Sequence, residues 1–129
     1  MGLDQYAHAT NTDGETVEEI SYWRKHNRLQ GWMENLWREK GRPNAHPDVP
    51  EDGMDFNCVP LPLTREDIDA LEVIVNGKDL PETVGFFFGG DSYEDYEGEW
   101  GDKKADLEFI QKARAHLKEG NEVSYSCWW

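Results

Sequence analysis

Cysteine, long apolar runs and positive charge are all scarce in this sequence of 129 residues. The two cysteines, Cys58 and Cys127, lie far apart and outside any CxxC pair, so their pattern predicts neither a disulfide framework nor a zinc site. No apolar run approaches the roughly 20 residues that a membrane helix needs, and no secretory signal is recognisable. We therefore expect reduced thiols in a cytoplasm and no association with a membrane.

Motifs that carry known chemistry are also missing. The sequence contains no P-loop, GxGxxG, GxSxG or HExxH pattern. His46 lies near several carboxylates, but their spacing matches no standard metal site. Carboxylates are too numerous for an acid–base pair to be singled out. We predict no catalytic residue, no metal site and no cofactor, and the balance favours a protein that binds rather than catalyses.

The charge that is present is mostly negative, with 27 Asp and Glu residues against 13 Lys and Arg and a formal net charge of −14. Six of the basic residues but only two of the acids lie between Ile20 and Arg42. Overall acidity argues against direct binding to nucleic acid or to an anionic membrane, because both need a cationic surface. It fits docking onto a basic protein surface, including that of a nucleic-acid-binding protein.

The stretch Ser21–Lys40 is predicted to be the central helix, ended by Gly41 and Pro43. At about 100° per residue, a broad face from Tyr22 to Trp37 should pack on the core, and a polar stripe that includes a tryptophan lies beside it. The stripe either lies at the boundary between the core and solvent or binds a ligand, and both interpretations stay open. The candidate ligand-binding residues are Tyr22, Trp23, Arg24, Lys25, Asn27, Gln30 and Glu34.

Other elements follow from local signals. Alternation predicts strands at 2–10 and 122–129. Thr64–Asp67 resembles a capping box that begins a helix ending near Asn76, and a third helix is expected at Lys103–Gly120. Val84–Phe88 is a short aromatic run that predicts a central, buried strand. The stretch Arg42–Leu63 holds five of the six prolines and should be irregular.

These elements predict a single α+β domain over residues 1–129. We expect a small, largely antiparallel sheet of three strands covered by three helices, in the order β-α-α-β-α-β. Val84–Phe88 would be the central strand of that sheet.

The segment Asp91–Asp102 contains six acids, no base, two tyrosines and a tryptophan. Three interpretations compete: a solvated acidic loop, a recognition loop with aromatic anchors for a basic partner, and a loop folded back on the basic helix of the same chain. The candidate partner-binding residues are Tyr93, Glu94, Asp95, Tyr96, Glu97, Glu99 and Trp100.

Several sequence motifs, taken in their order along the chain, resemble those of a known group of proteins. The chain opens on MGLDQY, continues with Tyr22-Trp23-Arg24-Lys25 and Asn27, then GFFFG at 85–89, and closes on SYSCWW. This order resembles a family of small uncharacterised bacteriophage proteins, and it covers most of the chain apart from the proline-rich stretch and Glu97–Trp100. The resemblance implies a phage source and a place in the host cell cytoplasm, with no activity attached.

Two functions from different classes remain at this point. The first is an acidic phage accessory protein that binds a host or anti-phage defence protein without catalysis, through a basic surface of that partner. The alternative is a small-ligand or nucleotide-binding protein (a sponge), or a minor nucleotide-processing enzyme, that uses the Tyr22–Asn27 stripe. An open pocket at the stripe would favour the alternative, and burial of the stripe under the acidic segment would remove its main support.

Overall fold

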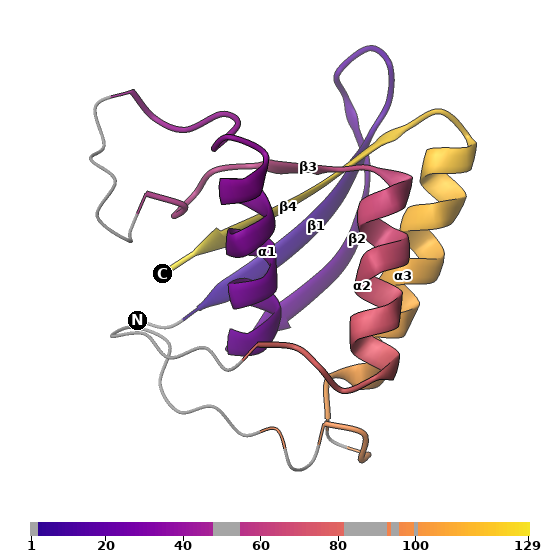
Figure 1. Cartoon of the computed structure of the whole chain (residues 1–129). Coiled ribbons are helices and arrows are strands. Elements are labelled where there is room, and N and C mark those ends of the chain that lie inside the picture. The colour runs from indigo at the N-terminus through magenta and orange to yellow at the C-terminus, as the bar shows by residue number, and fades with distance from the viewer. Residues whose placement is uncertain (1–2, 48–54, 82–92, 94–95, 100) are drawn as a thin grey trace.

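A computed structural model of the chain describes residues 3–47, 55–81, 93, 96–99 and 101–129 (Figure 1). Within them, four strands and three helices follow the order β-β-α-β-α-α-β. The elements are β1 (Asp4–Thr10), β2 (Thr16–Arg24), α1 (Asn27–Glu39), β3 (Leu61–Leu63), α2 (Arg65–Asn76), α3 (Lys103–Lys118) and β4 (Glu122–Trp128). None of the helices in this described part has the length and apolar character that crossing a membrane requires.

The strands form one antiparallel sheet in the order β2-β1-β4-β3. The first and last strands are therefore neighbours at its centre, which brings both ends of the chain to the same side of the molecule (Figure 1). Strand β3 lies at an edge, where Pro62 is tolerated because its missing N–H is not needed for pairing. Gly14, with φ +83°, closes the hairpin between β1 and β2.

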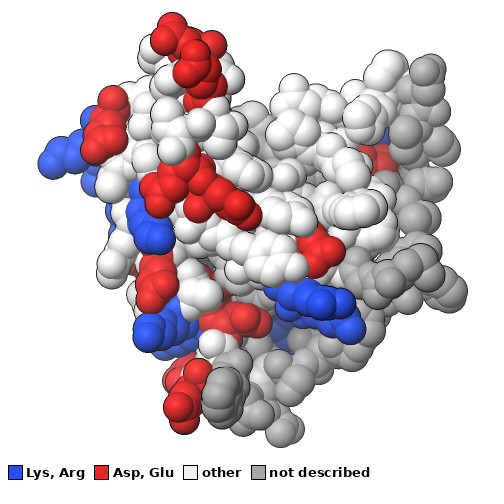
Figure 2. Space-filling view, turned by 180° about the vertical axis from the view of Figure 1, so that it is seen from behind, with Lys and Arg blue, Asp and Glu red and all other residues white. Residues whose placement is uncertain are grey.

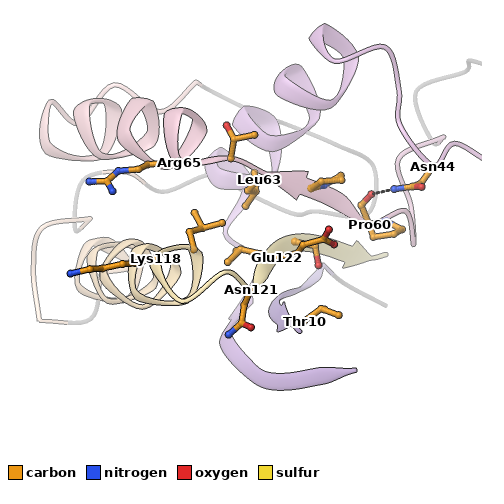
Figure 3. A pocket seen from close by; sticks show the side chains of 13 residues that line it. Thr10, Asn44, Pro60, Leu63, Arg65, Lys118, Asn121 and Glu122 are labelled. Atoms are coloured by element: carbon orange, nitrogen blue, oxygen red, sulfur yellow. Dashed lines mark hydrogen bonds between the residues drawn. The ribbon is translucent and has the colours of Figure 1, made fainter. Parts of the chain in front are cut away.

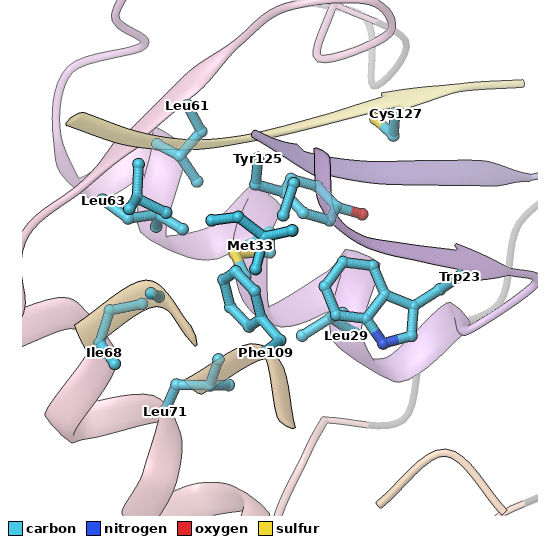
Figure 4. Packing of buried hydrophobic residues seen from close by; sticks show 14 of the residues in the cluster. Trp23, Leu29, Met33, Leu61, Leu63, Ile68, Leu71, Phe109, Tyr125 and Cys127 are labelled. Atoms are coloured by element: carbon cyan, nitrogen blue, oxygen red, sulfur yellow. The ribbon is translucent and has the colours of Figure 1, made fainter. Parts of the chain in front are cut away.

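One face of the sheet is covered by the helices. Alternate strand residues such as Ala7, Trp23 and Tyr125 are buried, and they meet apolar side chains from all three helices in one cluster (Figure 4). The helical side chains in that cluster include Leu29 and Met33 of α1, Ile68 and Leu71 of α2, and Phe109 of α3. The helices leave the opposite sheet face uncovered, and this asymmetry defines the candidate site below.

The α+β class is confirmed, but the predicted sheet and element order are wrong in detail. The described residues contain four strands rather than three, and two strands precede the first helix. The prediction of a helix from Ser21 is wrong, because β2 continues to Arg24 and α1 begins only at Asn27. The local composition suits a helix, but pairing with β1 along seven positions outweighs it. The predicted strand Val84–Phe88 lies outside the described residues.

The stretch Arg42–Leu63, expected to be irregular, contains the short strand β3 at Leu61–Leu63, whereas several other local predictions are confirmed. Thr64 caps α2 by accepting from the N–H of Asp67, whose carboxylate accepts from the N–H of Thr64, so the predicted capping box is confirmed. Helix α3 lies within the predicted range 103–120. Val123, Tyr125 and Cys127 share the buried face of β4, as the alternation predicts. Both cysteines are free thiols, Cys58 exposed and Cys127 buried.

Asp55 ties the chain beyond α1 back onto that helix. Its carboxylate is 1% exposed and lies 2.7 Å from Nη2 of both Arg38 and Arg42. Burial alone would raise the pKa of Asp55, but hydrogen bonds from Arg38, from its own backbone N–H and from Arg42 outweigh burial and hold the pKa below its ordinary value of 3.8. The ion pairs therefore contribute stability only while Asp55 is charged.

Acid should remove this contribution. We expect Asp55→Asn to lower the free energy of unfolding by about 2–3 kcal/mol at pH 7, because two guanidinium groups lose a charged acceptor. The folded-state pKa lies below the unfolded one, so the wild type keeps the contribution above about pH 4 and loses it as the pH falls through the folded-state pKa. Urea unfolding at pH 7 and near pH 3 should show the wild type and variant converging in acid. Glu97→Gln, at an exposed acid, is the control and should follow the wild type at both pH values.

Candidate functional site

Strand β2 and helix α1 meet at a two-residue corner, Lys25 and His26. Lys25 adopts a φ of +57°, which is unusual for a residue with a side chain, and its N–H donates to Leu3 O at 2.8 Å. The amide of Gln5 holds His26 from both sides: Oε1 accepts from His26 N at 2.9 Å, and Nε2 donates to His26 O at 3.0 Å. Strand β1 thus fixes the corner so that the His26 ring points toward α3.

Asp106 of α3 lies at the centre of a buried polar cluster. The residue is fully buried, and its Oδ1 accepts from Trp23 Nε1 at 2.9 Å. Its Oδ2 lies 2.8 Å from His26 Nε2 and accepts from the Tyr96 hydroxyl. Three donors from three separate segments therefore converge on one carboxylate, which compensates its removal from water. We call Asp106, Trp23, His26 and Tyr96 the Asp106 cluster.

Burial shifts the pKa values of two groups in or beside this cluster, Tyr96 and Asp102. Burial and the Asp106 carboxylate raise the pKa of the Tyr96 phenol far above its usual range, so Tyr96 remains a hydrogen donor. Asp102 is 46% exposed and lies 3.7 Å from His26 Nδ1. Burial raises the pKa of Asp102, although His26 acts in the opposite direction. The cluster therefore joins β2, α1, α3 and the segment before α3 into one polar contact.

A second buried group adjoins the first. Tyr125 accepts from Gln5 Nε2 at 3.0 Å and donates to Gln30 Oε1, and burial raises the pKa of its phenol. The Tyr125 ring also lies against Trp23, with centroids 6.3 Å apart. These contacts fill the space beneath the sheet with side chains of the chain itself.

The seven candidate ligand-binding residues differ in burial, and they lie on different sides of the sheet. Trp23, Asn27 and Gln30 are at most 2% exposed. Glu34 is partly exposed and pairs with Arg38. Tyr22, Arg24 and Lys25 are exposed, and Tyr22 points to the opposite side of the sheet from Trp23 because neighbours alternate on a strand. The seven side chains therefore line no common surface.

The described part of the acidic segment packs against the start of α1. Tyr96 is 4% exposed in the Asp106 cluster, and the Arg28 guanidinium lies 4.1 Å above the Tyr93 ring. Tyr93 also accepts from Leu80 N at 3.2 Å. Glu97 and Glu99 are exposed, while Glu94, Asp95 and Trp100 lie outside the described residues. Two aromatic side chains expected to anchor a partner are thus used within the chain.

The uncovered side of the sheet carries the exposed aromatic residues instead. In the strand register, Tyr22, Tyr6 and Ser126 form one cross-strand row, and Asp4 separates Arg24 from Trp128 in the next row. We call this surface the open face. Its residues are Asp4, Tyr6, His8, Thr10, Thr16, Glu19, Tyr22, Arg24, Glu122, Ser124, Ser126 and Trp128, and none of them is buried.

Aromatic rings on the open face are large and accessible. Trp128 is 61% exposed and Tyr22 is 51% exposed. The Tyr6 ring packs between its neighbours, with centroids 5.3 Å from Tyr22 and 6.2 Å from His8. Tyr22 is also held in place, because its hydroxyl donates to Asp4 at 2.6 Å. The Tyr6 and Tyr22 rings are therefore held in place by contacts within the chain.

Acidic side chains lie toward the hairpin end of the open face, and we call them the acidic rim. Asp13 and Glu15 on the hairpin, Glu19 on β2 and Glu122 on β4 are exposed, and none forms an ion pair with another described residue. Figure 2, which views the molecule from behind, shows acids at the hairpin and an uncharged area that is bordered by both acidic and basic side chains. The open face therefore joins exposed aromatic rings to a polar border, and the rim of a protein interface is usually polar.

The sequence alone predicts neither the Asp106 cluster nor the open face. Asp106 was not singled out, although it stands three and four residues before the apolar Phe109 and Ile110, a spacing that places a carboxylate on a buried helical face. Alternation in 2–10 and 122–129 places Tyr6 and Trp128 opposite the side chains that are buried in the structure. The contribution of β2 to the open face, including Tyr22, is missing from the predicted sheet, because no strand is predicted there and Ser21–Arg24 is assigned to a helix.

The described residues thus define an α+β protein whose antiparallel sheet is covered by helices on one face and carries exposed aromatic residues on the other. No family model matches the chain, and neither a curated protein nor a solved structure matches it.

Proposed function

We propose that this protein acts by docking on a partner protein that has a basic surface, and that the open face is where the partner binds. The observation that carries the proposal is the pairing of Trp128 and Tyr22, both more than half exposed, with four acids that make no ion pair in the described structure. Tyr and Trp are the residues that most often dominate binding energy at interfaces.

The charge favours a protein partner over a nucleic acid. The whole chain has a net charge of −14, and the open face carries Asp4, Glu19 and Glu122 against the single cation Arg24. Phosphates would be repelled by this surface, whereas lysines and arginines of a protein would be attracted. The resemblance to small phage proteins extends the proposal to a host or anti-phage defence protein as the partner.

A comparative pull-down tests the proposal. The wild-type chain, a Tyr22→Ser/Trp128→Ser variant and a Val73→Ser control are each immobilised and exposed to a bacterial lysate. Val73 is 70% exposed on α2, away from the open face. Its substitution therefore also replaces an exposed apolar side chain by serine, but on a different surface. We expect a protein that is retained by the wild type and the control, is released by about 0.5 M salt, and is lost with the double variant. Equal recovery by all three proteins would refute the proposal.

The acidic rim should act mainly on the association rate. For the partner so recovered, we expect Glu15→Gln/Glu19→Gln to slow association about 10-fold while changing dissociation little, because exposed charges steer encounter more than they hold the complex. Surface plasmon resonance at two salt concentrations measures both rates. Glu97→Gln/Glu99→Gln makes the same charge change on the acidic segment and should leave both rates near wild type. A slower association for this second variant alone would move the docking surface to that segment.

A further inference from the structure

A hollow of about 700 Å³ lies at one end of the sheet, outside both the Asp106 cluster and the aromatic part of the open face. It is bounded by the start of α2, the end of α3 and the neighbouring ends of β3 and β4 (Figure 3). Small-molecule sites typically have volumes of about 300–1,000 Å³. We call this feature the end hollow.

Apolar surface reaches the hollow from Leu117 of α3 and from Pro60 and Pro62. Leu63 and Val123 also border it, but they are 4% and 1% exposed and their side chains belong to the core. A ligand seated here would remove apolar surface from water without any rearrangement of the strands.

Two cations lie at the mouth of the end hollow, although the chain as a whole has a net charge of −14. Arg65, the first residue of α2, and Lys118, the last of α3, both line it and project to the same side in Figure 3. Neither forms an ion pair with a described residue, whereas Arg38, Arg42 and Arg114 all do. Among the described residues that line the hollow, Glu122 is the only one with a carboxylate side chain.

Hydrogen-bonding groups complete the lining. The hydroxyls of Thr10, Thr64 and Ser124 border the same space as the two cations, and Asn121 adds an amide. We infer that the end hollow binds a small organic anion, whose phosphate or carboxylate lies between Arg65 and Lys118 and whose apolar body covers Leu117 and Pro62. The end hollow shares Thr10, Glu122 and Ser124 with the margin of the open face, but it uses neither Tyr22 nor Trp128, so the two binding events can be tested separately.

Nuclear magnetic resonance titration of the full chain tests this inference with defined probes. Phenyl phosphate and benzoate carry the apolar body with each type of anion, inorganic phosphate carries only the charge, and phenol only the ring. We expect at least one of the two aromatic anions to shift the backbone amide signals of residues 62–65 and 117–124 saturably, with millimolar or tighter affinity. Phosphate and phenol should bind at least about 5-fold more weakly, because each lacks half of the contact.

Charge variants identify the site. Arg65→Gln and Lys118→Gln should each weaken binding of the aromatic anion about 5-fold or more, whereas Lys112→Gln, an exposed cation of α3 outside the hollow, should leave it unchanged. The inference is overturned if neither aromatic anion gives saturable shifts up to about 10 mM, or if inorganic phosphate or phenol alone binds as tightly. Shifts that survive both Gln substitutions also overturn it.

Discussion

Replacing Asp106 with alanine is expected to lower the free energy of unfolding by about 3–5 kcal/mol. The fully buried carboxylate accepts from Trp23 Nε1 and from Tyr96 and lies 2.8 Å from His26 Nε2. Alanine would leave these donors buried without an acceptor, and water would reach them only by loosening the packing. The loss should appear in urea unfolding as a lower midpoint with little change in slope.

Two further variants separate the hydrogen bonds from the general cost of changing α3. Asp106→Asn keeps the shape of the side chain but turns one acceptor into a donor that faces buried donors, so its loss should be intermediate, at about 2–3 kcal/mol. Glu108→Ala alters an exposed acid on the same helix and should stay within about 0.5 kcal/mol of wild type. If Asp106→Ala cost less than about 1 kcal/mol, the cluster would not be the junction described here.

The sequence predicted those helices and strands that are determined by residues close together in the chain. The capping box at Thr64 and Asp67 requires only four consecutive residues, and α2 begins where it predicts. The alternation of β4 identifies Tyr125 as buried and Trp128 as exposed without knowledge of the neighbouring strand. Such patterns depend on residues within one turn or one strand, so a single sequence contains them.

Strand β2 could not be predicted in the same way. Its last residues, Ser21–Arg24, run directly into a good helical sequence, and the pairing that makes them a strand comes from β1, more than a dozen residues earlier. Treating Tyr22 and Trp23 as helical put them on adjacent faces of one helix. On a strand they point to opposite sides of the sheet, one exposed and one buried. One error in element type therefore misplaced the candidate site.

The Asp106 cluster could not be predicted from the sequence for a similar reason, because distant parts of the chain form it. Trp23, His26 and Tyr96 each appeared in the sequence as a separate candidate for ligand, core or partner contact. Only the fold brings them onto one carboxylate that lies 80 or more residues from two of them. Their burial withdraws support from a ligand site at the stripe, and within the described residues the exposed Tyr and Trp side chains, Tyr22 and Trp128, lie on the open face.

The largest effect on partner binding is expected from the two exposed rings of the open face. Trp128→Ala and Tyr22→Ala should each raise the dissociation constant of the partner about 30-fold or more, which corresponds to about 2 kcal/mol. Both side chains are more than half exposed in the free protein, so truncation removes little folding energy. Isothermal titration calorimetry with the recovered partner measures the affinity, and urea unfolding checks that each variant remains folded.

Tyr22→Phe separates the ring from its hydroxyl. The hydroxyl is already committed to Asp4 within the chain, so a partner gains contact chiefly with the ring, and this variant should bind within about 3-fold of wild type. The Val73→Ala control should also bind normally, because Val73 lies on α2 away from the open face. If Trp128→Ala and Val73→Ala lowered affinity equally, general surface hydrophobicity rather than the open face would be binding the partner. Loss confined to Trp128→Ala and Tyr22→Ala would place the energetic centre of the interface on the sheet, with the acids as its rim.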